Sequence, residues 1–301
     1  MAHKQHDPGA FLRLPPQMSD TPDPRVVVLP IPYEASTSYI QGTARGPVAI
    51  IEASSQVEWF DESRGDEPCR AGLTTLPPLD CSGTPTEVVD RITDSVAGHV
   101  GEGRFVLSLG GEHTVTVGCA RGSAGGEALT VVQIDAHADL RDEYRGSRWS
   151  HACVMRRLSD RFPLLGIGIR SMSAEEGAFI ENSPAVTIVP AGEVASARCE
   201  HDGCLTWVER AIQAIDTERV YLTVDLDGLD PSVVPAVGTP EPGGLLWNEL
   251  LVFTRELFAS RDVVSADVVE LCPTPGSVTS DFAAARLAYK IAGHALRAAS
   301  G

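Results

Sequence analysis

Short apolar runs rich in β-branched residues recur along the whole chain, and amphipathic segments lie between them. Runs of this length that are apolar at nearly every position are typical of strands buried on both faces of a sheet. Seven strands are predicted in this way, at residues 25–30, 104–109, 129–135, 164–169, 185–190, 219–227 and 262–270. Their alternation with helical segments indicates an α/β fold with a parallel sheet covered by helices on both faces.

Four of the intervening segments have helical periodicity. They span residues 87–100, 204–215, 245–258 and 281–296. Thr84 is the expected N-cap of the first helix, and Pro85 suits its first helical position. No low-complexity linker, internal repeat or break in composition divides the chain. We therefore predict a single domain over residues 1–301, in which residues 1–20 form a loosely ordered N-terminal arm.

Composition and charge narrow the possible partners. The chain has 301 residues, of which 43% are hydrophobic and 22% charged, as is usual for a soluble globular protein. Its formal net charge of −17 argues against nucleic acid or an anionic membrane as the main partner, because both attract basic surfaces. No apolar stretch approaches the ~20 residues of a membrane span. An acidic surface also suits a cationic small substrate.

The cysteines and the N-terminus favour a cytoplasmic protein. The N-terminal segment lacks the apolar core of a secretory signal. Seven cysteines at irregular spacings suit a reducing compartment better than a disulfide framework. Cys199, His201 and Cys204 lie close together in the sequence, but no second pair of ligands follows at zinc spacing. We interpret these three residues as part of a loop.

Ionisable residues follow four of the predicted strands. The segment VVQIDAHADL, residues 131–140, presents Asp135, His137 and Asp139 at alternate positions, so that they share one face of an extended chain. Such crowded groups repel one another unless a cation lies between them. The other three strand ends carry His113, Asp225 and Asp227, and Glu270. Because ligands bind beyond the carboxyl ends of parallel strands, we expect all seven side chains at one edge of the sheet.

This set of residues has the donors for a metal site. Its aspartates and two imidazoles can hold two divalent ions with shared carboxylates. Without a thiolate, structural zinc is disfavoured, and the oxygen-rich donors suit Mn²⁺ or a similar ion. Two such ions, roughly 3.5–4 Å apart, lower the pKa of a bridging water towards neutrality. We predict a binuclear site with two Mn²⁺; a single-metal or purely structural site is the alternative.

Three segments carry a family resemblance. GGEH (110–113), DAHAD (135–139) and DLDGLDPSVVPAVGTPEPGGL (225–245) resemble the signature segments of the ureohydrolase superfamily, which includes arginases and agmatinases. The likeness begins at PYEASTSYIQGTARGP (32–47), which is similar to the N-terminal segment of agmatinases. It runs through VVELCP (268–273) and so covers nearly the whole chain.

The resemblance implies a fold and a ligand set. The family has a three-layer α/β/α domain with a mostly parallel sheet of about eight strands, usually assembled as trimers or hexamers, so we expect a homo-oligomer. One Mn²⁺ would be held by His113, Asp135, Asp139 and Asp225, and the other by His137, Asp135, Asp225 and Asp227. A metal-bridging hydroxide would then attack the guanidinium carbon to give urea and an amine. Glu112 departs from the pattern, since many members have Asp there, but this residue is not a ligand in the family.

The resemblance also suggests substrate contacts. A planar, permanently charged guanidinium needs a carboxylate to pair with its N–H groups, and Glu270 stands where the family keeps that residue. The leaving amine must be protonated by a group that titrates near neutrality. His151 matches the family's histidine on the loop after DAHAD. Asp139 is a candidate to pass the proton from the hydroxide to the leaving nitrogen.

The identity of the substrate depends on the far end of the pocket. Arginases recognise amino-acid groups through an Asn and an Asp, whose positions correspond here to Arg141 and Ser173. Because both are absent, and because residues 139–157 are similar to agmatinases, we predict hydrolysis of agmatine to putrescine. Arg141 at the pocket mouth would instead suit a carboxylate such as 4-guanidinobutyrate, and arginine is less favoured. Four acidic residues are candidates to attract a second substrate cation: Asp142, Glu143, Glu175 and Glu176.

Two functions of other classes remain open. A two-metal phosphoesterase would use the same metal chemistry on a phosphate, although the sequence lacks an evident Arg/Lys clamp or phosphate-binding glycine loop. A metal-binding regulatory or structural protein without catalysis is the other, and the presence of every expected ligand and of Glu270 argues against it. Release of urea rather than phosphate would separate the three functions.

Overall fold

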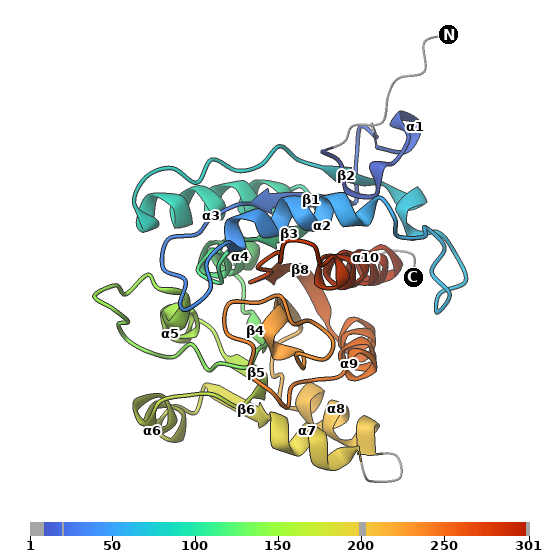
Figure 1. The fold of residues 1–301 in the computed structure, drawn as a ribbon. Helices are drawn as coiled ribbons and strands as arrows, with labels where there is room; N and C mark the ends of the chain where they lie inside the picture. Colours follow the sequence, from blue (N-terminus) through green and yellow to red (C-terminus); the bar gives the residue numbers. More distant parts are fainter. Residues whose placement is uncertain (1–8, 20, 199–202, 299–301) are drawn as a thin grey trace.

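Eight parallel strands form a single sheet at the centre of the protein (Figure 1). The computed structural model describes residues 9–19, 21–198 and 203–298. The strands are β1 Val26–Ile31, β2 Leu73–Thr75, β3 Phe105–Gly110, β4 Thr130–Ile134, β5 Leu164–Ile169, β6 Val186–Pro190, β7 Arg219–Asp225 and β8 Asp262–Val269. All seven predicted strands are confirmed. The short edge strand β2, which pairs only with β1, was not predicted.

Helices connect successive strands and cover the sheet. They are α1 Pro16–Ser19, α2 Gly46–Ser54, α3 Pro85–Gly101, α4 Val115–Ala124, α5 Val154–Ser159, α6 Ala174–Asn182, α7 Ala191–Ala197, α8 Gly203–Gln213, α9 Trp247–Ser260 and α10 Thr279–Ala298. The four predicted helices correspond to α3, α8, α9 and α10. Thr84 caps α3 as predicted, because its hydroxyl accepts from the Glu87 N–H while the Glu87 side chain accepts from the Thr84 N–H.

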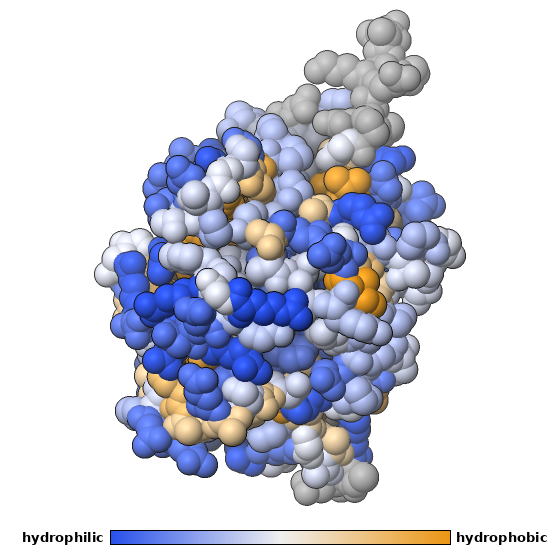
Figure 2. Space-filling model, turned by 60° about the vertical axis from the view of Figure 1, so that its left-hand side comes forward, coloured by the Kyte–Doolittle hydropathy of each residue, from blue (hydrophilic) through white to orange (hydrophobic). Residues whose placement is uncertain are grey.

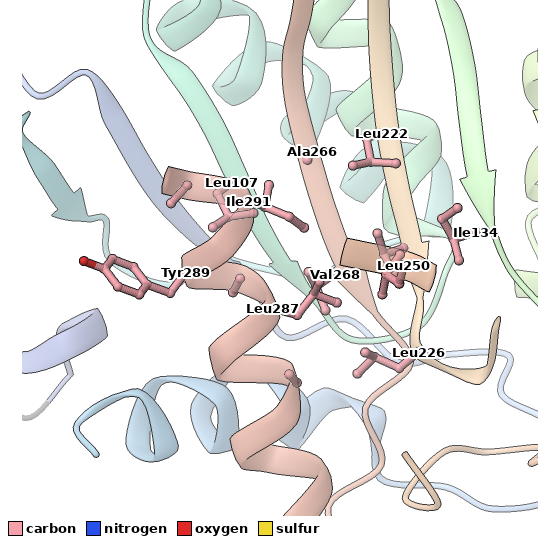
Figure 3. Packing of buried hydrophobic residues seen from close by; sticks show 14 of the residues in the cluster. Leu107, Ile134, Leu222, Leu226, Leu250, Ala266, Val268, Leu287, Tyr289 and Ile291 are labelled. Carbon is pink, nitrogen blue, oxygen red and sulfur yellow. The ribbon is translucent and has the colours of Figure 1, made fainter. Parts of the chain in front are cut away.

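The helices form one layer on each face of the sheet. Residues of α2, α7, α8, α9 and α10 share one buried apolar cluster with the strands, and residues of α3, α4 and α5 share a second. Figure 3 shows Leu250 of α9 and Leu287 of α10 beside Val268 of the sheet, and Ile291 of α10 beside Leu107. Each such fully buried aliphatic side chain stabilises the fold by roughly 1.5–3 kcal/mol. The predicted three-layer α/β/α architecture is confirmed.

The predicted loose N-terminal arm is wrong for residues 11–14. Phe11, Leu12 and Leu14 are buried in the same cluster as α2, and the Leu12 N–H donates to Ser54 Oγ at 2.7 Å. The three apolar side chains bury enough surface to hold this segment against the core. Residues 1–8 lie outside the described part of the chain. So do Cys199 and His201 of the predicted loop, whereas Cys204 falls within α8.

The strand order brings the candidate site together. The sheet runs β2-β1-β3-β8-β7-β4-β5-β6, so β3, β8, β7 and β4, the four strands followed by the candidate residues, are adjacent at its centre. Since all the strands are parallel, their carboxyl ends meet at one edge. None of the helices in the described residues has the length and hydropathy to cross a membrane. Hydrophilic residues predominate on the face drawn in Figure 2, with apolar residues in small separate patches.

Candidate metal centre

The candidate residues converge on one cavity at this edge of the sheet. The cavity has a volume of about 200 Å³. Eight of the nine predicted site residues line it: His113, His137, Asp139, Arg141, His151, Asp225, Asp227 and Glu270. The ninth, Asp135, is fully buried and contacts both His113 and His137. The structure thus brings the seven residues at the strand ends to one edge of the sheet, together with Arg141 and His151, and the roles of all nine stay predictions.

His113 lies at the centre of three carboxylates. Its Nδ1 atom is 2.9 Å from Asp139 Oδ2, 3.2 Å from Asp135 Oδ2 and 3.4 Å from Asp225 Oδ2. The imidazole is only 1% exposed. One nitrogen and three oxygens thus point at a common space that solvent barely reaches.

His137 forms a second group with Asp135 and Asp227. Its Nδ1 atom is 3.0 Å from Asp227 Oδ2 and 3.7 Å from Asp135 Oδ1. Asp135 therefore directs Oδ2 towards His113 and Oδ1 towards His137, so this one carboxylate is shared by two potential ligand sets. In each of the sets His113–Asp135–Asp139 and Asp135–His137–Asp227, one ligand atom from every residue lies within 4.8 Å of the others.

The hydrogen bonds of His113 prepare it to bind a cation. Its Nε2 lies 3.1 Å from Thr223 Oγ1, and the Thr223 hydroxyl donates to Asp267 Oδ1 at 2.5 Å. Thr223 has one hydroxyl hydrogen, so Nε2 must carry a hydrogen and donate it. Without a positive charge, Nδ1 would present a lone pair to carboxylate oxygens. Burial lowers the pKa of His113, but the contacts of Nδ1 with Asp135 and Asp139 outweigh this and raise it well above its usual value. A cation between these atoms removes the repulsion, so the residues present fit a metal ion.

Backbone N–H groups hold the carboxylates in place. The His137 N–H donates to Asp135 Oδ1 at 2.6 Å and the Asp227 N–H to Asp225 Oδ1 at 2.9 Å. The Gln133 side chain donates to Asp135 Oδ2 at 2.7 Å. These bonds fix the orientation of the oxygens before any ligand arrives.

The cavity has an excess of buried negative charge. Burial, with the nearby Asp135 adding to it, raises the pKa of Asp139 to about 7. Burial and neighbouring carboxylates also raise the pKa of Asp225 and that of Glu270 well above their ordinary values. Burial favours the neutral ring of His137, but its contacts with Asp135 and Asp227 outweigh this and raise its pKa to about 12. No Arg or Lys of the described residues forms an ion pair with these carboxylates, so the site favours an added cation.

Two site residues have a strained backbone. Asp139 has φ = 51° and Glu270 has φ = 65°, in the left-handed region that side chains other than glycine rarely adopt. Glu270 is held there because its N–H donates to the Gly111 carbonyl at 2.8 Å and its Oε1 accepts the His113 N–H at 2.7 Å. Such strain at two residues of one cavity is typical of functional sites.

The outer part of the cavity contains basic, aromatic and acidic side chains. Of these, the sequence analysis named Arg141 and Glu176 but not Tyr144. Arg141 Nε lies 3.6 Å from Glu176 Oε2, and its guanidinium stacks over the Tyr144 ring at 5.3 Å. Of the four acidic candidates, only Glu176 lines the cavity, where it also forms the capping box of α6 with Ser173. Asp142 instead pairs with arginines, 2.9 Å from Arg148 Nη2.

Comparison with known proteins identifies the family. The arginase family pattern matches residues 24–293. The chain is 43% identical to an N(1)-aminopropylagmatine ureohydrolase of Synechocystis sp., over 96% of this chain and 97% of that protein. It is 37% identical to a protein of the same name from Thermus thermophilus, over 91% and 92%. The crystal structure of agmatine ureohydrolase of Thermoplasma volcanium matches with a TM-score of 0.80 and 30% identity, over 90% of this chain and 89% of that one. The chain belongs to the arginase family, as the sequence motifs indicated.

Proposed function

We propose that this arginase-family protein hydrolyses a guanidino amine to urea and an amine, and that it does so with two divalent ions, Mn²⁺ first among them. The observation that carries the proposal is the pair of ligand sets joined through the two oxygens of Asp135. Nitrogen and carboxylate donors without thiolate suit Mn²⁺. When bound, such a pair of ions activates water for attack on the guanidinium carbon.

The chain's own residues would divide the ligands between two positions. His113, Asp139, Asp135 and Asp225 surround the first position. His137, Asp227 and Asp135 surround the second, where we also place Asp225 as a shared ligand. The fixed hydrogen bonds to Asp135 and Asp225 keep their oxygens aimed at these positions, which lowers the cost of organising the site when the ions bind.

Glu270 is suited to bind the substrate guanidinium. It is 8% exposed, lines the cavity and uses Oε1 to accept the His113 N–H. Its second oxygen remains available to accept guanidinium N–H groups. Because its neighbours are other carboxylates, a cationic substrate relieves repulsion that the protein itself does not.

We place N(1)-aminopropylagmatine ahead of agmatine as the substrate. Its support is the similarity to two proteins of that name over nine-tenths or more of this chain. In addition, Tyr144 lines both the cavity of the ligand sets and a second cavity of about 730 Å³. A substrate longer than agmatine would extend towards this second cavity, whose lining includes Glu34 and also Arg45 and Arg145.

A guanidino acid is the second candidate, because Arg141 lines the cavity. The Arg141 guanidinium is close to Glu176 and over Tyr144. Its charge is therefore partly balanced within the protein, which weakens its attraction for a substrate carboxylate. For this reason we rank 4-guanidinobutyrate below the two amines.

Urea release by Mn²⁺-loaded protein tests the proposal. Equal concentrations of N(1)-aminopropylagmatine, agmatine, 4-guanidinobutyrate and arginine are compared, with chelator-treated protein and a phosphate ester as controls. We expect kcat/KM to be highest for N(1)-aminopropylagmatine, followed by agmatine, 4-guanidinobutyrate and arginine. We expect no release of phosphate. The highest kcat/KM with arginine would contradict the substrate proposal, and phosphate release without urea would contradict the reaction.

A further inference from the structure

A buried chain of polar groups connects Glu112 to the catalytic cavity through Ser36 and His151. Glu112 follows β3 and is 0% exposed. Ser36 lies in the loop after β1, 76 residues away from Glu112 in the sequence. His151 begins the short helix η4 (His151–Cys153) and lines the cavity. Neither the Glu112–Ser36 contact nor the Ser36–His151 contact joins residues that are close in the sequence.

The carboxylate of Glu112 is saturated with donors. Its Oε2 accepts the backbone N–H groups of Ala35 and Ser36, each at 2.6 Å. Its Oε1 accepts the hydroxyls of Ser36 at 2.8 Å and Thr114 at 2.6 Å. Four donors occupy both oxygens, so the Glu112 side chain acts only as an acceptor. The single hydroxyl hydrogen of Ser36 is therefore committed to Glu112.

Because the Ser36 hydroxyl donates to Glu112, its oxygen can only accept hydrogen bonds from His151. Ser36 Oγ accepts the backbone N–H of His151 at 2.9 Å and lies 3.2 Å from its ring Nδ1. Having no further hydrogen to give, Ser36 Oγ can only accept at Nδ1, so Nδ1 must carry the hydrogen.

Ser150 Oγ also lies 3.3 Å from Nδ1 and could donate to it instead. In that arrangement the lone pairs of Ser36 Oγ and Nδ1 would face each other at 3.2 Å. A hydrogen on Nδ1 shared between the two hydroxyls avoids this repulsion, and Nε2 makes no hydrogen bond to a described residue.

We propose that Glu112, acting through Ser36, holds His151 in the tautomer with its hydrogen on Nδ1, so that Nε2 presents a lone pair to the cavity. Glu112 and Ser36 are then positioning residues, and neutral His151 accepts a hydrogen bond from a substrate N–H. This part rests on the proposed function. Neutral His151 in this tautomer has no proton on Nε2 to give to the leaving amine, so the donor role expected from the sequence would require the imidazolium.

The tautomer can be measured directly. The full chain is labelled with ¹⁵N at histidine, loaded with diamagnetic Mg²⁺ and studied by two-bond ¹H–¹⁵N NMR at about pH 8, above the ordinary histidine pKa of ~6.5. The His151→Gln variant identifies the signals of His151. We expect a pyrrole-type Nδ1 and a pyridine-type Nε2 in the wild type. A wild-type ring protonated on Nε2 would overturn the proposal.

Two matched variants identify what sets the tautomer. Ser36→Ala is expected to shift His151 towards the Nε2–H form, because Ser150 can then donate to Nδ1, whereas Ser150→Ala is expected to keep the Nδ1–H form. Ser36→Thr, which retains a hydroxyl, should restore it. An unchanged tautomer in a folded Ser36→Ala variant would overturn the role of Ser36, and the wild-type spectrum tests the tautomer even if that variant fails to fold.

Kinetics connects the tautomer to the reaction. With Mn²⁺-loaded protein, Ser36→Ala should lower kcat/KM for urea release by about tenfold, as loss of an outer hydrogen bond typically does, and Ser36→Thr should recover most of it. Absence of urea from the wild type together with an Nδ1–H ring would refute the proposed function and leave the tautomer established. Urea release with an Nε2–H ring would refute the tautomer alone.

Discussion

The negative charge of buried carboxylates is neutralised differently in two regions of this protein. Asp61 is 1% exposed, and Lys290 Nζ of α10 donates to it at 2.8 Å. Burial alone would raise the pKa of Asp61, but the hydrogen bond and charge of Lys290, together with the hydrogen bonds of Ser63, outweigh this and lower it to about 2. Asp225 and Glu270 in the cavity have other carboxylates as their neighbours, and their pKa values are raised.

The difference separates a structural ion pair from a binding site. The Asp61–Lys290 pair contains its own counter-charge and needs nothing further to be stable. The cavity concentrates negative charge without an Arg or Lys partner among the described residues, and its carboxylates are aimed inward by backbone donors. Such a site favours added cations, and in the proposed function these are the metal ions and the substrate guanidinium.

The largest expected effect comes from Glu270→Gln, which removes the charge that would pair with guanidinium. We expect kcat/KM for urea release to fall about a thousandfold, or roughly 4 kcal/mol of activation free energy. Metal content should stay at the wild-type level, because Glu270 is not among the proposed ligands. Steady-state kinetics and metal analysis of the same sample check this prediction, and near-normal kcat/KM would refute the role of Glu270.

Lys290→Met tests the structural ion pair. It leaves Asp61 buried without its cation, and we expect a loss of about 3 kcal/mol in the free energy of unfolding, as for other broken buried pairs. Urea denaturation measures this loss, and the double variant Asp61→Asn/Lys290→Met should recover much of it.

Asp225→Asn is the matching test within the cavity. In the presence of chelator, this variant should have the same free energy of unfolding as the wild type or a higher one, because it removes repulsion between Asp225 and the neighbouring carboxylates. A similar loss of unfolding free energy in Lys290→Met and in Asp225→Asn would refute the difference between the two regions.

The same pair predicts a pH dependence. Because the folded pKa of Asp61 is lowered to about 2, its contribution to stability is complete above the unfolded pKa of ~3.9. It is lost as the pH falls through the folded value. The stability difference between wild type and Lys290→Met should therefore shrink between about pH 4 and pH 2, and a constant difference across this range would contradict the assignment.

Thr223→Val should weaken metal binding without touching a ligand. It breaks the connection from His113 Nε2 to Asp267, so the tautomer that leaves Nδ1 free is no longer fixed. We expect the Mn²⁺ affinity of the His113 position to fall roughly 10–100-fold. Calorimetric titration measures it, and Thr223→Ser, which keeps the hydroxyl, is the matched control. Equal affinities in the Val and Ser variants would show that the hydroxyl does not orient His113.

The smallest effect is expected at the mouth of the cavity. Arg141→Met removes a partly balanced cation, so kcat/KM for N(1)-aminopropylagmatine relative to 4-guanidinobutyrate should rise by about fivefold, or roughly 1 kcal/mol. Competition between the two substrates in a single reaction measures this ratio. A fall in the ratio would indicate that Arg141 serves the amine.

The strands and the residues that follow them could be predicted because each is a local pattern. Residues 220–224, for example, are buried and mostly apolar, and the ionisable residues Asp225 and Asp227 come at the end of this run. The edge strand β2 has three residues, too few for a periodic signal. Helix α2 begins with Gly46 and Pro47 and was not predicted either.

The supporting contacts could not be predicted because they depend on the strand order. Thr223 and His113 are 110 residues apart, and they meet only because β7 lies two positions from β3 in the sheet. The left-handed backbone of Asp139 and Glu270 leaves no mark on residue type. For Glu112, the sequence showed only a departure from a motif, whereas the structure shows four donors bound to its carboxylate.

Metal stoichiometry tests the central claim most directly. Wild type, Asp225→Ala and Asp227→Ala are dialysed against Mn²⁺, and bound metal per chain is measured by elemental analysis. We predict about two equivalents for a two-metal site in the wild type and about one in Asp227→Ala. In Asp225→Ala, occupancy should fall at both positions, because this residue is the proposed shared ligand. A wild type that binds a single equivalent, or an Asp225→Ala variant that retains two, would contradict the account.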